Sequence, residues 1–212
     1  MPVAVAATAA ATLLLTACGG GDSKADDKIP GTESSAPAPA SPSPSPSPSE
    51  AAGRPKITLP PDVKNVFEGW TTGDPVKDAI LTDVSAQMNA TDEAITSDAA
   101  EPAGVIFYNK GDALIGAGKW IADFKTKGLT ITGTTHYYNP KIQLFDDKSA
   151  GVGFCTDESK AFTKDRKTGK VNEDTASGNS YVTYSLRVDK NAQGVWQTTK
   201  LASQRGDKTC TP

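Results

Sequence analysis

Prolines are concentrated in one stretch of this chain. Ten of its 15 prolines lie between Pro30 and Pro61, and residues 36–49 contain only Ala, Pro and Ser. Frequent proline removes backbone N–H donors and fixes φ near the polyproline II value, so this stretch cannot build a core. We expect residues 18–60 to form a disordered, semi-rigid tether. The sequence that remains for folding is a single domain over residues 61–212.

The expected domain is close to electrically neutral. Residues 61–212 carry 18 basic and 20 acidic side chains, with both signs mixed along the sequence. Nucleic-acid binding needs clustered Lys and Arg that displace counterions from phosphates. DNA and RNA are therefore not expected partners. About 150 residues can bury roughly 70% of their unfolded surface, which is enough for a core without metals.

The N-terminal segment predicts export. Residues 1–17 carry no charge and include an apolar run that ends in three leucines at residues 13–15. A transmembrane helix needs about 20 apolar residues, whereas the apolar region of a signal peptide needs only about 7 to 15. The length of the run therefore favours a signal peptide. The sequence departs from the usual pattern in one respect, because no Lys or Arg precedes Leu13.

A short motif follows the apolar run. Residues 15–18 read Leu-Thr-Ala-Cys and resemble the lipobox of bacterial lipoproteins, Leu-(Ala/Ser/Thr)-(Gly/Ala)-Cys, at all four positions. The resemblance implies cleavage before Cys18 and a diacylglycerol, palmitate-type anchor on its thiol. It also implies a location on the extracytoplasmic side of the cell membrane. The alternative is an ordinary buried thiol in an apolar segment.

Two helices are expected at the start of the domain. Asp74 and Pro75 predict a helix start, since Asp accepts free N–H groups and Pro suits the first helical position. Val76, Ile80, Val84 and Met88 follow as one apolar stripe.

A second helix is expected from about residue 111 to 127, with Gly128 as its C-terminal stop. Gly116 and Gly118 lie inside this helix and are expected where another backbone packs closely. Its inward side chains are expected to be Leu114, Ile115, Trp120, Ile121 and Phe124.

From Leu129 onward, apolar residues recur at every second position and no longer at every fourth, which is typical of strands. The last two expected strands are joined by a turn-rich loop and predict a hairpin. Residues 163–179 are charged and nearly free of apolar side chains, so we expect a mobile surface loop. The expected strands are residues 129–138, 141–145, 150–156, 180–189 and 195–204.

This element order resembles the NTF2-like family, also called SnoaL-like or ketosteroid-isomerase-like. Besides element order, the resemblance rests on Lys-Gly-Leu-Thr at 127–130, Val-Gly-Phe-Cys-Thr-Asp at 152–157 and Val-Trp at 195–196, and it covers roughly residues 70–210. It implies an α+β cone, in which two N-terminal helices pack on a curved antiparallel sheet around a cavity. Members use that cavity for catalysis, binding or dimerisation, so the fold leaves function open.

Two cysteines remain after Cys18. Cys155 and Cys210 would lie in an oxidising compartment, where thiols pair, so we expect a disulfide between them. Closing a loop of this size stabilises a domain by roughly 4 kcal/mol in the chain-entropy model. The alternatives are two isolated thiols or, with less support, a zinc site, since no CxxC or His-x-His spacing accompanies them.

Motifs for catalysis are scarce. His136 is the one histidine, and no Gly-x-Ser-x-Gly nucleophile elbow occurs, so we expect a strand histidine without a catalytic role. Proton transfer of the ketosteroid-isomerase type would need a buried carboxylate facing a tyrosine. Four tyrosines lie in the expected strands, but no apolar-flanked aspartate accompanies them there. The acidic pairs at residues 146–147 and 157–158 are expected to be solvated turns.

Two functional hypotheses remain. The first is a membrane-anchored binding or accessory module with no catalytic residue, no metal and no cofactor. Its inward side chains would be mostly apolar and aromatic, with at most a hydroxyl or two and no carboxylate facing His136 or a tyrosine. Its partners would be the membrane, through Cys18, and a small apolar ligand or a cell-envelope protein. The second is a small-molecule enzyme of the isomerase or hydrolase type that uses the cone pocket.

Overall fold

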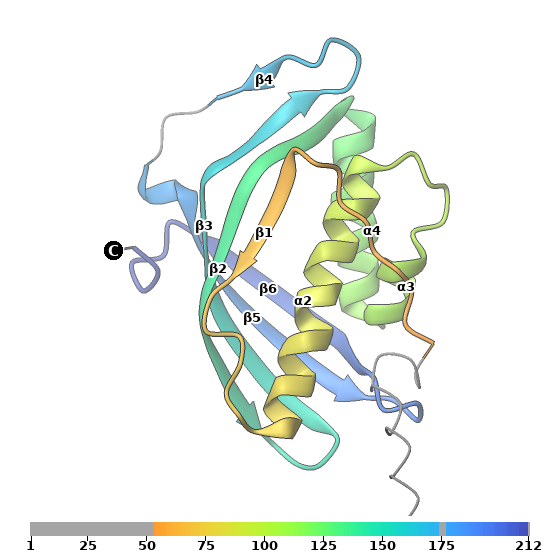
Figure 1. Cartoon of the computed structure of the whole chain (residues 1–212), viewed down its shortest axis with the longest axis vertical. Helices are drawn as coiled ribbons and strands as arrows, with labels where there is room; N and C mark the ends of the chain where they lie inside the picture. The colour runs from red at the N-terminus through yellow and green to blue at the C-terminus, as the bar shows by residue number, and fades with distance from the viewer. Residues whose placement is uncertain (1–52, 174–176, 212) are drawn as a thin grey trace, which may run out of the picture. The chain divides into compact units, whose positions relative to one another are not determined.

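Helices cover one face of a curved β-sheet in the described part of the chain (Figure 1). The computed structural model describes residues 53–173 and 177–211. The expected signal peptide, Cys18 and most of the expected tether lie outside these residues. The elements in chain order are β1 (Val63–Phe67), α2 (Pro75–Thr96), α3 (Ala103–Tyr108), α4 (Asp112–Thr126), β2 (Leu129–Leu144), β3 (Ser149–Asp165), β4 (Val171–Asn172), the 3₁₀ turn η1 (Gly178–Ser180), β5 (Tyr181–Lys190) and β6 (Trp196–Arg205).

The sheet is open and mixed. Its strand order is β1-β2-β3-β5-β6, and β4 pairs with β3 beside this path. All strand pairs among the described residues are antiparallel except β1 with β2, which runs parallel from Val63 opposite Gly133 to Phe67 opposite Tyr137. The expected α+β class and curved sheet are therefore confirmed, and the expected antiparallel pairing holds for every described strand pair but β1 with β2.

The first helix begins where the sequence predicts. Asp74 accepts hydrogen bonds from the backbone N–H groups of Val76 at 2.9 Å and Lys77 at 3.1 Å, and Pro75 is the first helical residue. The buried side of α2 then packs against the sheet. Within residues 53–128 three helices precede β2, not two, because residues 103–108 form a separate short helix, α3.

Only a narrow stripe of α4 is buried. Ile121 and Phe124 are buried as predicted, but Ile115 and Trp120 are 58% and 51% exposed. The buried stripe starts at Ala113 and follows helical spacing through Ile121 to Phe124, and the two exposed side chains lie off this stripe. The prediction that Ile115 and Trp120 point inward is therefore wrong.

Close backbone packing involves a different glycine from the two predicted. A Cβ atom added at Gly116 or Gly118 would meet nothing within 4 Å, so neither lies at a tight contact. A Cβ added at Gly104, on α3, would lie 2.8 Å from the Cβ of Ala90 on α2. The close approach is thus between α2 and α3.

Gly133 marks a sharp irregularity in β2. Its φ is +99°, and an added Cβ would lie 2.1 Å from the carbonyl oxygen of Lys160 on β3. Bulges follow between Thr134 and His136 and between Tyr138 and Lys141. Bulges increase local twist and bend a strand, so this part of β2 curves the sheet around the helices.

Ordered contacts begin before the expected boundary at residue 61. Arg54 forms two hydrogen bonds of 2.9 Å with the carboxylate of Asp83 on α2. The backbone N–H of Thr58 donates to Glu93 on the same helix at 2.6 Å. The segment that leads into β1 is therefore attached along α2.

The expected loop over residues 163–179 is partly regular. β3 continues to Asp165, and the short strand β4 pairs with its end. Asp165 stabilises the intervening turn by accepting hydrogen bonds from the backbone N–H groups of Lys167 at 3.0 Å and Thr168 at 2.7 Å.

We expect Gly133→Ala to lower the free energy of unfolding by about 1 to 3 kcal/mol, because alanine is strained at this φ and its Cβ meets a backbone oxygen. Gly116→Ala is the matched control and should raise that free energy by up to about 1 kcal/mol, since it replaces an exposed helical glycine. Urea denaturation measures both. Equal effects at the two positions would contradict the assignment of Gly133 as a bend point.

Candidate functional site

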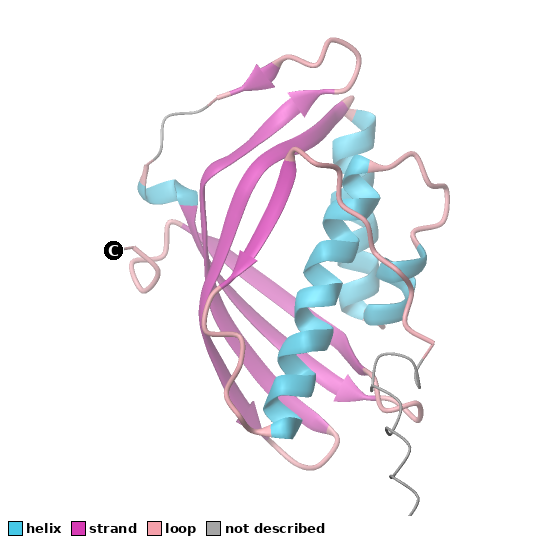
Figure 2. Cartoon of the chain, viewed as in Figure 1, coloured by secondary structure: helices cyan, strands magenta, loops and turns pink. Residues whose placement is uncertain are grey.

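Neighbouring residues of β2 point to opposite faces of the sheet. Tyr137 is buried toward the helices, on what we call the inner face. His136 and Tyr138 lie on the other side, the outer face. Figure 2 shows the helices gathered on the inner side of the strands. The two faces carry different groups of functional side chains and are described in turn.

Aromatic side chains fill part of the inner face. Phe67 stacks on Tyr137 with ring centroids 4.5 Å apart, and Phe154 stacks on Tyr184 at 5.0 Å. Trp70 joins the two pairs, at 5.3 Å from Phe154 and 6.2 Å from Tyr137. We call these five residues the aromatic cluster. They pack against the core formed by α2 and the sheet, so the expectation of inward aromatic side chains is confirmed.

A group of polar side chains lies near the aromatic cluster. The Asn65 amide, on β1, donates hydrogen bonds to Asn89 Oδ1 at 2.9 Å and to Asp92 Oδ2 at 2.6 Å, both on α2. On β3, Glu158 accepts a hydrogen bond from the buried Thr156 at 3.2 Å. We call these five residues the inner polar cluster. Arg205 of β6 pairs with Glu158 at its margin, at 2.5 Å.

The inner polar cluster has unusual acid–base properties. Burial raises the pKa of Asp92 to about 7, the Asn65 hydrogen bond opposes this shift, and the charge of Glu158 adds to it. Burial also raises the pKa values of Tyr137 and Tyr184, with further contributions from Asp92 and Glu158. Near neutral pH, Asp92 can therefore take up or release a proton while the phenols of Tyr137 and Tyr184 stay protonated.

Sequence reasoning missed both carboxylates of this cluster. Asp92 comes four residues after Met88, so it occupies the next position of the apolar stripe of α2, and that placement was the available signal. Glu158 lies within β3, which corrects the prediction of a solvated turn at residues 157–158. Both carboxylates contribute to the raised pKa values of Tyr137 and Tyr184, although no hydrogen bond joins either of them to a tyrosine hydroxyl among the described residues.

The outer face carries a solvent-open pocket of about 550 Å³, which we call the outer pocket. It lies between the chain segment after β1, the bulge of β2 and the C-terminal tail. Asn139 adopts a left-handed φ of +52° in that bulge, and Pro140 follows it. The pocket is lined by Glu68, Gly69, His136, Tyr138, Asn139, Pro140, Asp157, Tyr181 and residues 209–211.

His136 lies in the outer pocket and not on the inner face. Its Nε2 atom is 2.8 Å from Glu68 Oε2, and its ring stacks on Tyr138 with centroids 5.6 Å apart. The residue on β3 opposite His136 is Asp157. His136 is thus a strand histidine, as predicted, and it contributes to a pocket that the sequence did not reveal.

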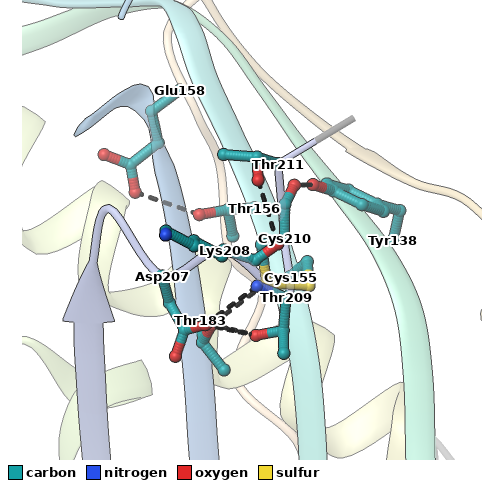
Figure 3. The surroundings of a disulfide bond; sticks show 10 residues. All are labelled: Tyr138, Cys155, Thr156, Glu158, Thr183, Asp207, Lys208, Thr209, Cys210 and Thr211. Atoms are coloured by element: carbon teal, nitrogen blue, oxygen red, sulfur yellow. Dashed lines mark hydrogen bonds between the residues drawn. A yellow bond between two sulfur atoms is a disulfide. The ribbon is translucent and has the colours of Figure 1, made fainter. Parts of the chain in front are cut away.

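The C-terminal tail forms one wall of the outer pocket. The structure joins Cys155 and Cys210 in the disulfide expected from the sequence, with their Cα atoms 5.5 Å apart. Figure 3 shows the Tyr138 hydroxyl donating a hydrogen bond to the carbonyl oxygen of Cys210. The backbone N–H of Thr209 donates to Asp207 at 2.9 Å. The disulfide and the Tyr138–Cys210 hydrogen bond hold the tail against the outer face of the sheet.

The described residues contain neither a metal-binding cluster nor a helix able to span a membrane. No group of three or more His, Cys, Asp or Glu side chains is placed to hold a metal ion within residues 53–173 and 177–211. Within the same ranges, no helix has both the length and the apolar character needed to cross a membrane.

Comparison with known proteins gives structural neighbours alone. No protein-family model matches the chain, and no curated protein does. The intermembrane-space region of the chloroplast protein ARC6 superposes with a TM-score of 0.41 at 13% identity, over 58% of this chain and 92% of that chain. A ketosteroid isomerase-like protein from Erwinia carotovora atroseptica SCRI1043 superposes with a TM-score of 0.39 at 18% identity, over 60% of this chain and 93% of that chain. Likeness at this level carries no argument about activity or ligand.

We expect Asp92 to make the protein less stable as the pH rises from about 4 to 7. In this range the folded state keeps the Asp92 proton, whereas the unfolded chain releases it near pH 3.9, so raising the pH favours unfolding. The full pKa shift corresponds to about 4 kcal/mol, and partial exposure of Asp92 reduces this to about 2 kcal/mol. Urea denaturation at several pH values measures the slope.

Asp92→Asn should remove this dependence, because the amide keeps a hydrogen-bond acceptor and does not titrate. At pH 8 the variant should be more stable than the unaltered protein, whereas at pH 4 the two should be similar. The exposed Glu101→Gln serves as the control and should leave the slope unchanged. Parallel pH profiles for Asp92→Asn and the unaltered protein would contradict burial of the Asp92 charge.

Proposed function

We propose that the chain is a membrane-anchored, extracytoplasmic binding or accessory module with an NTF2-like α+β domain. Lipid on Cys18 holds it to the cell membrane, and the segment over residues 18–60 separates the domain from the surface. Its second partner is a small ligand or a cell-envelope protein. The observation that carries the binding role is the outer pocket, whose volume of about 550 Å³ falls within the usual range for small-molecule sites.

Two further observations support this assignment. The Cys155–Cys210 disulfide fits an oxidising compartment outside the cytoplasm. The aromatic cluster occupies space on the inner face with packed rings, which favours a structural role there and binding elsewhere. The lipobox at residues 15–18 supplies the anchor, since two acyl chains provide stable attachment where one is marginal.

Cys18→Ala should release the protein from the membrane fraction, because the variant has no thiol to acylate. Metabolic labelling with a fatty-acid analogue should mark the unaltered chain and leave Cys18→Ala unlabelled. Thr16→Ala is the matched control, since alanine also fits the lipobox, and it should keep both label and membrane attachment. Persistent membrane retention of Cys18→Ala would refute the lipid anchor.

A second candidate function is proton-transfer catalysis at the inner polar cluster. One feature favours it: burial raises the pKa of Asp92 to about 7, and the charge of Asp92 contributes to the raised pKa values of the buried Tyr137 and Tyr184. A general base works best when its pKa is near the working pH, and a protonated phenol can donate a hydrogen bond to a developing oxyanion.

An activity screen with enolisable ketones and with ester substrates separates the two functions. A non-catalytic module should give no turnover above buffer. If turnover occurs at the inner polar cluster, Asp92→Asn should reduce it by at least about 100-fold, whereas His136→Ala should leave it unchanged, since loss of a general base typically costs a factor of 10²–10⁴. Turnover that depends on Asp92 would replace the binding function with the enzymatic one.

A further inference from the structure

We infer that the outer pocket binds a small organic cation, with its charged nitrogen near the carboxylates of Glu68 and Asp157 and the rings of Tyr138 and Tyr181. This inference rests on the binding function proposed above and specifies the chemical class of its ligand. It departs from the small apolar ligand expected from the sequence, because the pocket's lining is charged and aromatic.

The charge of the lining is the first argument. Two carboxylates line the outer pocket, and no Lys or Arg is among the described residues that do so. The Glu68 side chain is 69% exposed and close to His136, so it stays accessible to a ligand. Asp157 accepts a hydrogen bond from the backbone N–H of Ser159 at 2.8 Å, and no ion pair of Asp157 is found within the described ranges. An anionic ligand would be repelled here.

Aromatic rings are the second argument. Tyr138, Tyr181 and His136 line the same pocket. The face of an aromatic ring attracts a cation within about 6 Å, and this attraction is the usual basis for recognising quaternary ammonium groups. Tyr138 cannot move freely, because it stacks on His136 and its hydroxyl donates to Cys210. One ring of the site is therefore already positioned before a ligand binds.

The electrostatics of Tyr138 agree with a negative potential in the pocket. Burial raises the pKa of this phenol, and the charges of Asp157 and Tyr181 raise it further. Of these causes, the charge of Asp157 would also favour a positive charge at this position.

The tail gives the pocket a fixed wall. Residues 209–211 line it, and the disulfide fastens Cys210 to Cys155 on β3. A site that is formed before binding loses little free energy in ordering itself, which favours binding of a small ligand. A metal ion is a weaker fit than an organic cation, because no metal-holding group occurs among the described residues and the lining is partly aromatic.

Isothermal titration of the full chain with choline tests the inference, and 3,3-dimethyl-1-butanol serves as a neutral ligand of the same shape. Choline should bind, and the neutral alcohol should bind at least about tenfold more weakly, because it lacks the charge. Asp157→Asn and Glu68→Gln should each weaken choline binding by about tenfold. The exposed Glu101→Gln, outside the pocket, should leave it unchanged. Thermal melts establish that each variant is folded.

Two further experiments test the role of the Tyr181 ring and the source of the ammonium ligand. Tyr181→Phe keeps the ring and should retain binding, whereas Tyr181→Leu should weaken it. Free choline and phosphatidylcholine vesicles are compared, because the same ammonium group occurs as a solute and as a lipid headgroup. Binding of the free solute identifies a soluble ligand, and binding of vesicles alone identifies a headgroup.

Three results would overturn the inference. They are equal affinity for the neutral alcohol, unchanged affinity in the Glu68→Gln, Asp157→Asn double variant, and no binding of either choline source. None of these results bears on the proposed membrane anchor or on the expected absence of turnover. Cys18→Ala tests the anchor, and the substrate screen tests turnover. Failure of the ligand assignment is therefore distinguishable from failure of the proposed function.

Discussion

A buried carboxylate on α2 joins three parts of the chain that are distant in sequence. Asp83 is fully buried, accepts two hydrogen bonds from Arg54 before β1, and accepts a third from the backbone N–H of Trp196 at the start of β6, each at 2.9 Å. Breaking a buried ion pair of this kind costs about 3–5 kcal/mol, because the remaining charge is left without its partner. Asp83 thus ties α2 to the segment before β1 and to β6, in addition to the apolar packing of α2 on the sheet.

Local sequence signals predicted the elements that depend on local interactions. The start of α2 at Asp74 follows from its cap, and the β5–β6 hairpin follows from alternation around a turn-rich loop. β1 was missed because its partner, β2, begins more than sixty residues later in the chain, and a parallel pairing leaves no turn signal between the two strands. Ile115 and Trp120 on α4 were predicted to be buried but are exposed, because helical periodicity alone does not give the width of the buried stripe.

The candidate sites were harder to predict than the fold, for a physical reason. The Cys155–Cys210 disulfide could be predicted from the number of cysteines and from the expected oxidising compartment alone. Asp92 looks like an ordinary helical aspartate until β1 and β3 are placed beside it, since its raised pKa comes from burial and from Glu158. The outer pocket takes its walls from the segment after β1, from β2, β3 and β5, and from the tail, and the β2 bulge at Asn139 and Pro140 lines it. No local pattern encodes such an assembly.

The attachment of Arg54 to Asp83 also has a mechanical consequence. A pulling force applied to the chain before residue 53 reaches this ion pair before it reaches β1, an edge strand of the sheet. The two parallel hydrogen bonds of the guanidinium group share such a load, whereas an edge strand peels away one hydrogen bond at a time. Tension is thus directed into α2 and the centre of the domain, and the sheet edge is spared.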